Sequence, residues 1–247
     1  MSRAINAVEA VPYRKIVGRD ALAIRVAHTA ASPKDHLATS LAVYVNRANP
    51  LAQLTAAQVS QILSAGNPAG DFTRWGQLGL QGEWRERVIH PSGTAAYTGF
   101  GDYLQRAHFQ GRALALRHEE LGNTEAITAR IAQDPAGIGV ATLGWVNAAA
   151  ISDQVRVLPL AARNGDPYYC PDKATVQACR YPLAMPVQLY VNRAPGRPLD
   201  PLVKAYLQLA LSLQGQAVIA LQQDSDEGYL PLGEGDLQAE RNKLDAL

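Results

Sequence analysis

Two segments of the chain, LAVYVNRANPLAQLT at 41–55 and VQLYVNRAPGRPLDP at 187–201, share the run Tyr-Val-Asn-Arg-Ala. In each segment a short apolar run typical of a strand ends at the asparagine, and a proline and a helix start follow. We expect the two segments to form adjacent strands that both connect the lobes. The chain would leave a first lobe through one strand and return to it through the other, after an inserted lobe. The alternative is a chance likeness between two strand-to-helix turns.

Strand and helix patterns alternate along the rest of the chain, which predicts an α/β fold. Apolar strand patterns occupy 21–27, 41–46 and 155–160. Thr55 with Gln58 is a capping box, and Asp200 before a proline is typical of a helix N-cap. After Asp200, apolar side chains recur on one helical face: Leu202, Val203, Tyr206, Leu207, Ala210 and Leu213. We expect lobe I to comprise 1–46 and 187–247, and lobe II to comprise 47–186.

The composition is that of a folded protein. The chain has 247 residues, of which 47% are hydrophobic and 18% charged, and its net charge is +1. Lys and Arg are scattered without a basic stripe, so nucleic acid is not an expected partner. No apolar run approaches the ~20 residues that span a bilayer. The N-terminal residues lack the layout of a secretory signal, so the protein is either cytosolic or exported by a signal that is absent from this chain.

The chain has two cysteines, Cys170 and Cys179, which flank a polar segment that contains a proline. A disulfide that closes this loop is the expected arrangement, and it would indicate an oxidising compartment. The alternative is two unpaired thiols. A metal site is not expected, because no histidine or further cysteine lies near them in the sequence.

Six segments, taken in order, resemble the PstS-like phosphate-binding proteins of ABC transporters, which have the type 2 periplasmic binding fold. They are MSR at 1–3, LAVYVNRANPLAQLTAAQVSQIL at 41–63, RWGQLG at 74–79, HPSGTAAYTGF at 90–100, DPAGIGVATLGWV at 134–146, and RYPLAMPVQLYVNRAPGRPLDPLVKAYLQLALSLQGQAVI at 180–219 with GYLPL at 228–232. The resemblance implies two α/β lobes joined by two hinge strands, which the twin segments would supply. It also implies a periplasmic or secreted protein that captures phosphate or a related small oxyanion for an inner-membrane ABC permease, without a cofactor.

The chain also departs from the family pattern. Nothing corresponds to the family's first strand–helix–strand unit and its Gly/Ser-rich loop, so lobe I is expected to be incomplete, and the protein monomeric unless another chain completes that lobe. Val88 and Arg3 stand where many members have Arg and Asp, and with a small gap His90 takes the place of that Arg. These departures favour the alternative of a sensor or scaffold domain with altered or lost ligand binding.

The segment HPSGTAAYTGF carries the strongest local signal for a site. Ser92, Gly93 and Thr94 are predicted at a strand-to-helix turn, where the first helical N–H groups have no internal partners. Those groups and the helix dipole favour an anion, the two hydroxyls add donors, and the glycine allows close approach of the backbone. From the local sequence alone, an ordinary helix cap explains the same residues.

Five further residues are candidates for ligand contact. His90 would supply one N–H donor, or it is a turn histidine bonded to backbone. Tyr97 reaches the cleft or packs within its lobe. Asn123 or Thr124 caps a helix whose start, in the family, points at the cleft. Arg3 pairs with an oxyanion, or it is a solvated terminal side chain.

Enzymatic patterns are weak, so the protein is not expected to be an enzyme. The five histidines show no HxH or HExxH metal spacing. Ser92 lacks the Gly-x-Ser-x-Gly context of a hydrolase nucleophile. A hydrolase of phosphate esters, the third alternative, has no recognisable base or metal-ligand set.

Overall fold

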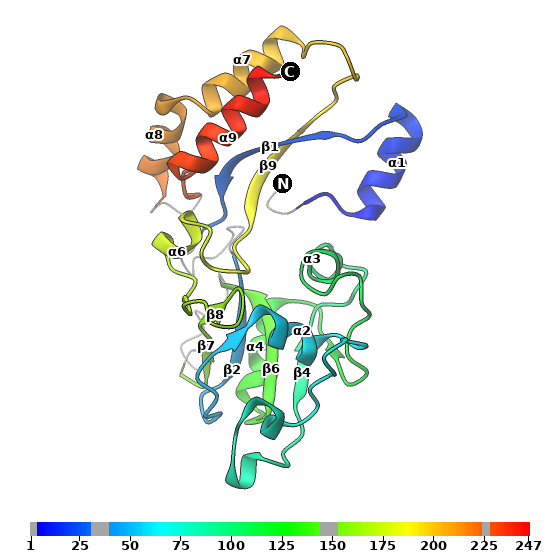
Figure 1. Ribbon diagram of the computed structural model, residues 1–247, viewed down its shortest axis with the longest axis vertical. Helices are drawn as coiled ribbons and strands as arrows, with labels where there is room; N and C mark the ends of the chain where they lie inside the picture. Colours follow the sequence, from blue (N-terminus) through cyan, green and yellow to red (C-terminus); the bar gives the residue numbers. More distant parts are fainter. Residues whose placement is uncertain (1–3, 31–39, 144–152, 224–227) are drawn as a thin grey trace.

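The computed structural model describes residues 4–30, 40–143, 153–223 and 228–247, which form a larger lower lobe and a smaller upper lobe (Figure 1). Both lobes combine strands with helices, so the α/β prediction is confirmed. Of the helices that the structure describes, none combines the length and apolar character that crossing a membrane requires.

The lower lobe is built on a five-stranded sheet with the order β5–β4–β6–β2–β7. Its strands are β2 (Leu41–Asn46), β4 (His90–Gly93), β5 (Glu119–Glu120), β6 (Gly137–Thr142) and β7 (Val155–Val157). Strand β4 runs parallel to β5 and β6, whereas β2 runs antiparallel to β6 and β7. All six residues of β2 are buried, as a continuous apolar strand covered on both faces requires.

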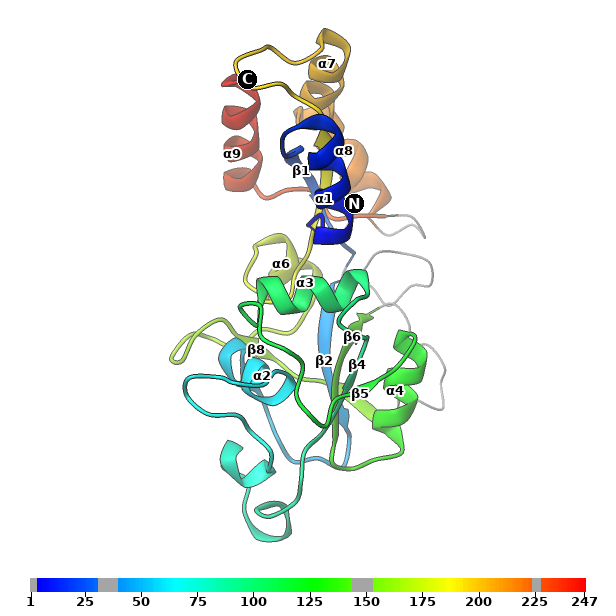
Figure 2. The same cartoon turned by 90° about the vertical axis from the view of Figure 1, so that its right-hand side faces the viewer.

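Helices cover both faces of this sheet (Figure 2). Helix α4 (Thr124–Ala132) packs Ile127 and Ile131 against Tyr44 on one face. On the other face, α2 (Ala56–Leu63) and α3 (Gly99–Ala107) contribute to the core around Val43 and Val45. The remaining elements are β3 (Leu54–Thr55), paired with β8 (Leu160–Ala161), the 3₁₀ turns η1 (Trp75–Leu78) and η2 (Gly82–Trp84), and α6 (Lys173–Gln177).

The upper lobe has a two-stranded antiparallel sheet, β1 (Leu22–His28) with β9 (Pro186–Val191). Helices α7 (Pro201–Ala210), α8 (Leu213–Gln222) and α9 (Glu234–Asp245) belong to this lobe, and side chains from α7 and α9 contribute to a core around Ile24 and Val26. A two-stranded sheet is marginal alone, so this lobe depends on the helices that pack against it. Helix α1 (Ala7–Val17) follows an Asn6–Glu9 capping box, and none of its residues is buried.

Large apolar side chains on the upper lobe are exposed. They are Val8, Val11, Ile16, Leu202, Tyr206, Leu209, Leu213, Val218 and Leu221. The predicted apolar face after Asp200 is therefore buried only in part: Leu207 is packed, whereas Leu202 and Tyr206 face solvent. The helix also breaks at Leu211, and Ser212 caps α8 by accepting a hydrogen bond from the amide of Gly215.

The two lobes meet where β1 and β9 run toward the lower sheet. Here Thr29 links the segment that enters the lower lobe to the segment that returns from it. Its amide donates to the carbonyl of Met185 at 2.9 Å. Its hydroxyl lies 3.0 Å from the same carbonyl and 3.0 Å from the hydroxyl of Ser40, next to β2. A third segment joins this crossing, because Leu230 exchanges backbone hydrogen bonds with His28.

The expectation that the twin segments lie side by side is wrong. The first Tyr-Val-Asn-Arg-Ala run begins in β2, whose partners are β6 and β7, and the second begins in β9, whose partner is β1. The physical reason is that the chain has already entered the lower lobe at Ser40, before the first run starts. The lobe limits at 46/47 and 186/187 stay a prediction, and a first limit near residue 40 would keep β2 with its sheet.

Candidate functional site

The carboxyl ends of β4 and β6 lie at the edge of the lower sheet that faces the upper lobe (Figure 2). Ser92 pairs with Gly139 in the parallel ladder, so both strands point the same way. Thr142, at the end of β6, pairs with Leu41, the neighbour of Ser40 at the crossing between the lobes. The Ser-Gly-Thr segment is therefore at the interlobe edge.

Ser92 presents a buried hydroxyl at this edge. The residue is 1% exposed, and its Oγ makes no hydrogen bond within the described part of the chain. The side chain lies over Gly139, where an added Cβ would come 3.0 Å from the Ser92 Oγ. A buried hydroxyl without a partner is uncommon and calls for a missing group, and a ligand oxygen or a water would supply it.

The ring of His118 lies next to Gly93, whereas the sequence indicated a solvated surface residue beside Glu119 and Glu120. A Cβ on Gly93 would come 2.9 Å from His118 Cε1. Burial lowers the pKa of His118, although backbone groups of Thr94 and Gly93 beside the ring act in the opposite direction. The cavity between them measures about 10 Å³, roughly the room for one water. This cavity is therefore too small for an oxyanion such as phosphate.

The prediction that Ser92, Gly93 and Thr94 sit at a helix start is wrong. Helix α3 begins at Gly99, and its N-cap is Thr98, whose hydroxyl accepts from the amide of Gly101 at 3.0 Å. Pairing of Gly93 with β5, including the bond from the Leu121 amide to its carbonyl, keeps Ser-Gly-Thr extended. Tyr97 lies in the turn before α3, and the residue is 83% exposed.

The start of α4 lies at the same edge. Asn123 is its N-cap and accepts from the amide of Ala126 at 2.8 Å, as a capping role predicts. The hydroxyl of Thr124 lies 2.9 Å from that of Thr142 at the end of β6. The sequence did not identify Thr142; the signal that locates it is the parallel register of β6 with β4. Ser92, Thr94, Thr124 and Thr142 thus share one edge.

His90 is not part of this group. It begins β4, four residues before Thr94, which corresponds to about 13 Å along an extended strand. Its Nδ1 lies 2.6 Å from Oδ2 of Asp134, beyond the far end of α4. Burial alone would raise the pKa of Asp134, but the hydrogen bonds from His90 and from the Ala136 amide outweigh it and lower that pKa.

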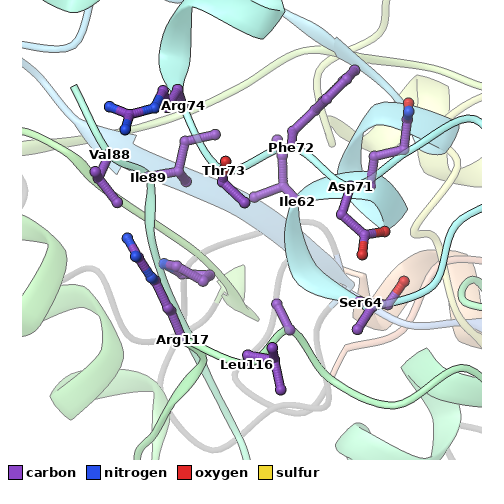
Figure 3. A pocket seen from close by; sticks show the side chains of 14 residues that line it. Ile62, Ser64, Asp71, Phe72, Thr73, Arg74, Val88, Ile89, Leu116 and Arg117 are labelled. Carbon is purple, nitrogen blue, oxygen red and sulfur yellow. The ribbon is translucent and has the colours of Figure 1, made fainter. Parts of the chain in front are cut away.

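Arg3 lies outside the described residues, so the structure does not place it. Val88 lines a separate pocket of about 320 Å³ between α2 and the segments 71–74, 88–91 and 115–117 (Figure 3). Two charged side chains of this pocket, Asp71 and Arg74, already form hydrogen bonds to other residues of the protein. Hydrogen bonds from the side chain of Asn67 and from the Asn67 and Gly66 amides lower the pKa of Asp71, and Arg74 donates to the carbonyl of Glu86.

The predicted disulfide is not formed: Cys170 and Cys179 are both free in the structure. Helix α6, whose capping box joins Asp172 and Thr175, lies between them. The thiol of Cys179 instead lies 3.2 Å from Oδ2 of Asp236 in α9.

Comparisons with known proteins place the chain in a family, although no family model matches it. The phosphate-binding protein PstS of Pseudomonas aeruginosa is 30% identical over 236 residues, which cover 94% of this chain and 67% of the relative.

Two solved structures share the fold. PstS from Borrelia burgdorferi is 15% identical with a TM-score of 0.60, covering 94% of this chain and 78% of its own. An ABC-type phosphate transport receptor from Vibrio cholerae is 16% identical with a TM-score of 0.59, covering 93% and 78%. Sequence identity along nearly the whole chain and a common two-lobed fold agree with the order of motifs: the chain belongs to the PstS family of phosphate-binding proteins.

Proposed function

We propose that the protein captures phosphate, or a related small oxyanion, at the interlobe edge of the lower sheet and delivers it to an ABC permease. The observation that carries this proposal is the 30% identity to a phosphate-binding protein over 94% of the chain. A relative of the same fold is a receptor of ABC-type phosphate transport. Such a role requires an extracytoplasmic location, and we propose the periplasm.

The chemistry of the edge supports an oxyanion as ligand. Ser92 and Thr94 offer hydroxyl donors from β4 and the following loop. The Thr124–Thr142 pair offers one more from α4 and β6, because the other O–H group of the pair is used in the bond between them. The first amides of α4 add donors and a favourable dipole. Hydroxyl and amide donors bind an anion by directed hydrogen bonds, and a ligand that leaves them unpaired is rejected at a high energetic cost.

Binding rather than catalysis is the role that fits these groups. His90, a candidate general base, is bonded to Asp134 at the other end of β4. His118 lies beside Gly93 with its pKa lowered by burial, but the adjoining cavity of about 10 Å³ has no room for a phosphate ester.

A second candidate is a sensor or scaffold domain with altered or lost ligand binding. Two observations favour it: the His118 ring lies over Gly93, and α3 begins at Gly99 rather than at Ser92. Because α3 begins at Gly99, the amides of the Ser-Gly-Thr segment lack a helix dipole. In a sensor or scaffold, the edge would bind oxyanions weakly or not at all.

Thermal unfolding in the presence of phosphate distinguishes the two candidates. A ligand at 100 times its Kd stabilises the folded protein by about 2.7 kcal/mol, so a receptor unfolds at a clearly higher temperature. Sodium chloride at the same ionic strength controls for general salt effects, and sulfate tests a related oxyanion. An unfolding temperature that no oxyanion raises would contradict the receptor proposal and support the sensor or scaffold.

A further inference from the structure

Three residues far apart in the sequence bring metal-ligating atoms together where the lobes meet. They are His28 at the end of β1, Cys179 after α6, and Asp236 in the first turn of α9. All three ligand atoms lie within 4.8 Å of one another. The separate distances are 3.2 Å from Cys179 Sγ to Asp236 Oδ2, 3.7 Å from that oxygen to His28 Nε2, and 4.0 Å from Sγ to Nε2.

These distances match the edges of a tetrahedral site. With Zn–S of about 2.3 Å and Zn–N and Zn–O of about 2.0 Å, tetrahedral angles give separations of about 3.5 Å for S–N and S–O and about 3.3 Å for N–O. Each observed separation differs from its ideal value by about 0.5 Å or less, which side-chain rotations can accommodate. Thiolate, imidazole and carboxylate together form a donor set typical of zinc.

The surroundings supply the features that a metal site needs. His28 is 2% exposed, so its ring is held firmly. Asp236 directs Oδ2 to the cluster while its Oδ1 accepts from Arg25 at 2.9 Å, which fixes the carboxylate in the way outer partners of metal ligands do. A cavity of about 180 Å³ opens over His28, Cys179 and Arg25. It would give an ion a path from solvent to His28 and Cys179.

The backbone of Cys179 adds an independent observation. Its φ is +51°, in the left-handed region that a non-glycine residue adopts at a cost. Such strain persists where the surroundings impose it, and here it coincides with the thiol facing His28 and Asp236.

A cysteine nucleophile is the competing interpretation of the same residues, and the geometry argues against it. In a catalytic triad the histidine lies between the cysteine and the carboxylate. Here the carboxylate is the nearer neighbour of the thiol, at 3.2 Å, and the histidine is at 4.0 Å.

We propose that His28, Cys179 and Asp236 bind a divalent metal ion of the zinc class, with water as the fourth ligand. On binding, the thiol loses its proton to solvent and Sγ, Nε2 and Oδ2 each donate a lone pair to the ion. Thiolate and carboxylate together balance the charge of the ion. The bound ion would connect β1, α9 and the loop after α6, and this site is separate from the oxyanion edge at Ser92.

Cobalt(II) titration of the reduced protein tests the proposal, because a thiolate-to-cobalt charge-transfer band appears only when sulfur is a ligand. We expect one equivalent of Co²⁺ to produce the band and Zn²⁺ to displace it. Cys179→Ser should abolish the band and Asp236→Asn should weaken Co²⁺ binding, while Cys170→Ser, the matched control, should leave it unchanged. Circular dichroism verifies the fold of each variant. No band with the unsubstituted protein, or equal loss with Cys170→Ser, would overturn the proposal.

A second measurement needs no substitution and so cannot fail through misfolding. Iodoacetamide modification of the two thiols is followed separately by peptide mass spectrometry. At Zn²⁺ concentrations 100 times Kd, modification of Cys179 should be about 100-fold slower, and modification of Cys170 unchanged. Equal rates at Cys179 with and without Zn²⁺ would rule the site out.

Discussion

The hydroxyl of Thr124 lies 2.9 Å from the hydroxyl of Thr142, and this contact joins the first turn of α4 to the last residue of β6. The Thr142 amide also donates to the Thr124 hydroxyl, at 3.3 Å. The end of a strand and the start of a helix are thereby held at the edge where the Ser-Gly-Thr segment ends. Of the predicted ligand-contact residues that the structure describes, those of the α4 start and those at 92–94 lie together at this edge.

Removal of two hydroxyls from this edge should abolish oxyanion binding. In Ser92→Ala with Thr94→Val, both donors are lost while the volume of the side chains changes little. At phosphate concentrations 100 times Kd, we expect the unsubstituted protein to gain about 2.7 kcal/mol in unfolding free energy and the variant to gain none. Thr73→Val, at the opposite end of the lower lobe, is the control. An unchanged phosphate effect in the double variant would remove these residues from the site.

Two glycines of the lower sheet should respond differently to alanine. At Gly93 the new Cβ would come 2.9 Å from His118 Cε1, a side-chain atom that can shift, whereas at Gly139 it would come 2.5 Å from the backbone oxygen of Ser92. We expect a loss of unfolding free energy of about 1 kcal/mol for Gly93→Ala and about 3 kcal/mol for Gly139→Ala. Urea unfolding measures both. The reverse order would show that His118 is fixed more rigidly than the strand.

The folded protein should lose stability in mild acid partly through His108. Burial lowers the pKa of His108 to about 4, below the value of about 6.5 expected in the unfolded chain. Between these two pH values the unfolded chain binds a proton that the folded protein does not, so stability falls as pH falls, by up to about 3 kcal/mol.

His108→Phe removes the imidazole that takes up this proton. It keeps an aromatic ring next to Tyr103, whose ring centroid is 5.4 Å from that of His108. Denaturant unfolding from pH 7.5 to pH 4.5 should therefore show a smaller decrease for the variant. Parallel pH profiles of the two proteins would contradict the role of His108.

Helix α7 should tolerate truncation on one face and not on the other. Leu207 is 1% exposed and packs in the upper core, whereas Leu209 is 58% exposed. Leu207→Ala should lower the unfolding free energy by about 2–4 kcal/mol, and Leu209→Ala should change it by less than about 0.5 kcal/mol. A large loss from Leu209→Ala in urea unfolding would mean that further polypeptide covers this face.

Local features of the fold could be predicted from the sequence because their causes are local. The capping box of Thr55 with Gln58, the N-cap Asn123 and the N-cap Asp200 all occur as expected. Each depends on residues within three positions, and the side-chain hydrogen bond is a direct consequence of the residue types.

Features that depend on distant partners could not be predicted in this way. The run shared by β2 and β9 gave no information on their different partners. The Ser-Gly-Thr segment was predicted at a helix start, but α3 begins after Thr98 because β5 keeps Gly93 extended. His28 and Asp236 come close to Cys179 only through tertiary structure, so the sequence around the cysteines could not indicate this cluster.

The bonds of Thr29 to Ser40 and Met185 have a mechanical consequence. Since the outgoing and returning backbones are fastened to each other at this threonine, a change in the angle between the lobes has to be absorbed by a few residues on either side of it. Sliding of one lobe past the other would break these bonds, whereas rotation about an axis through Thr29 would preserve them. The joint is therefore built as a pivot.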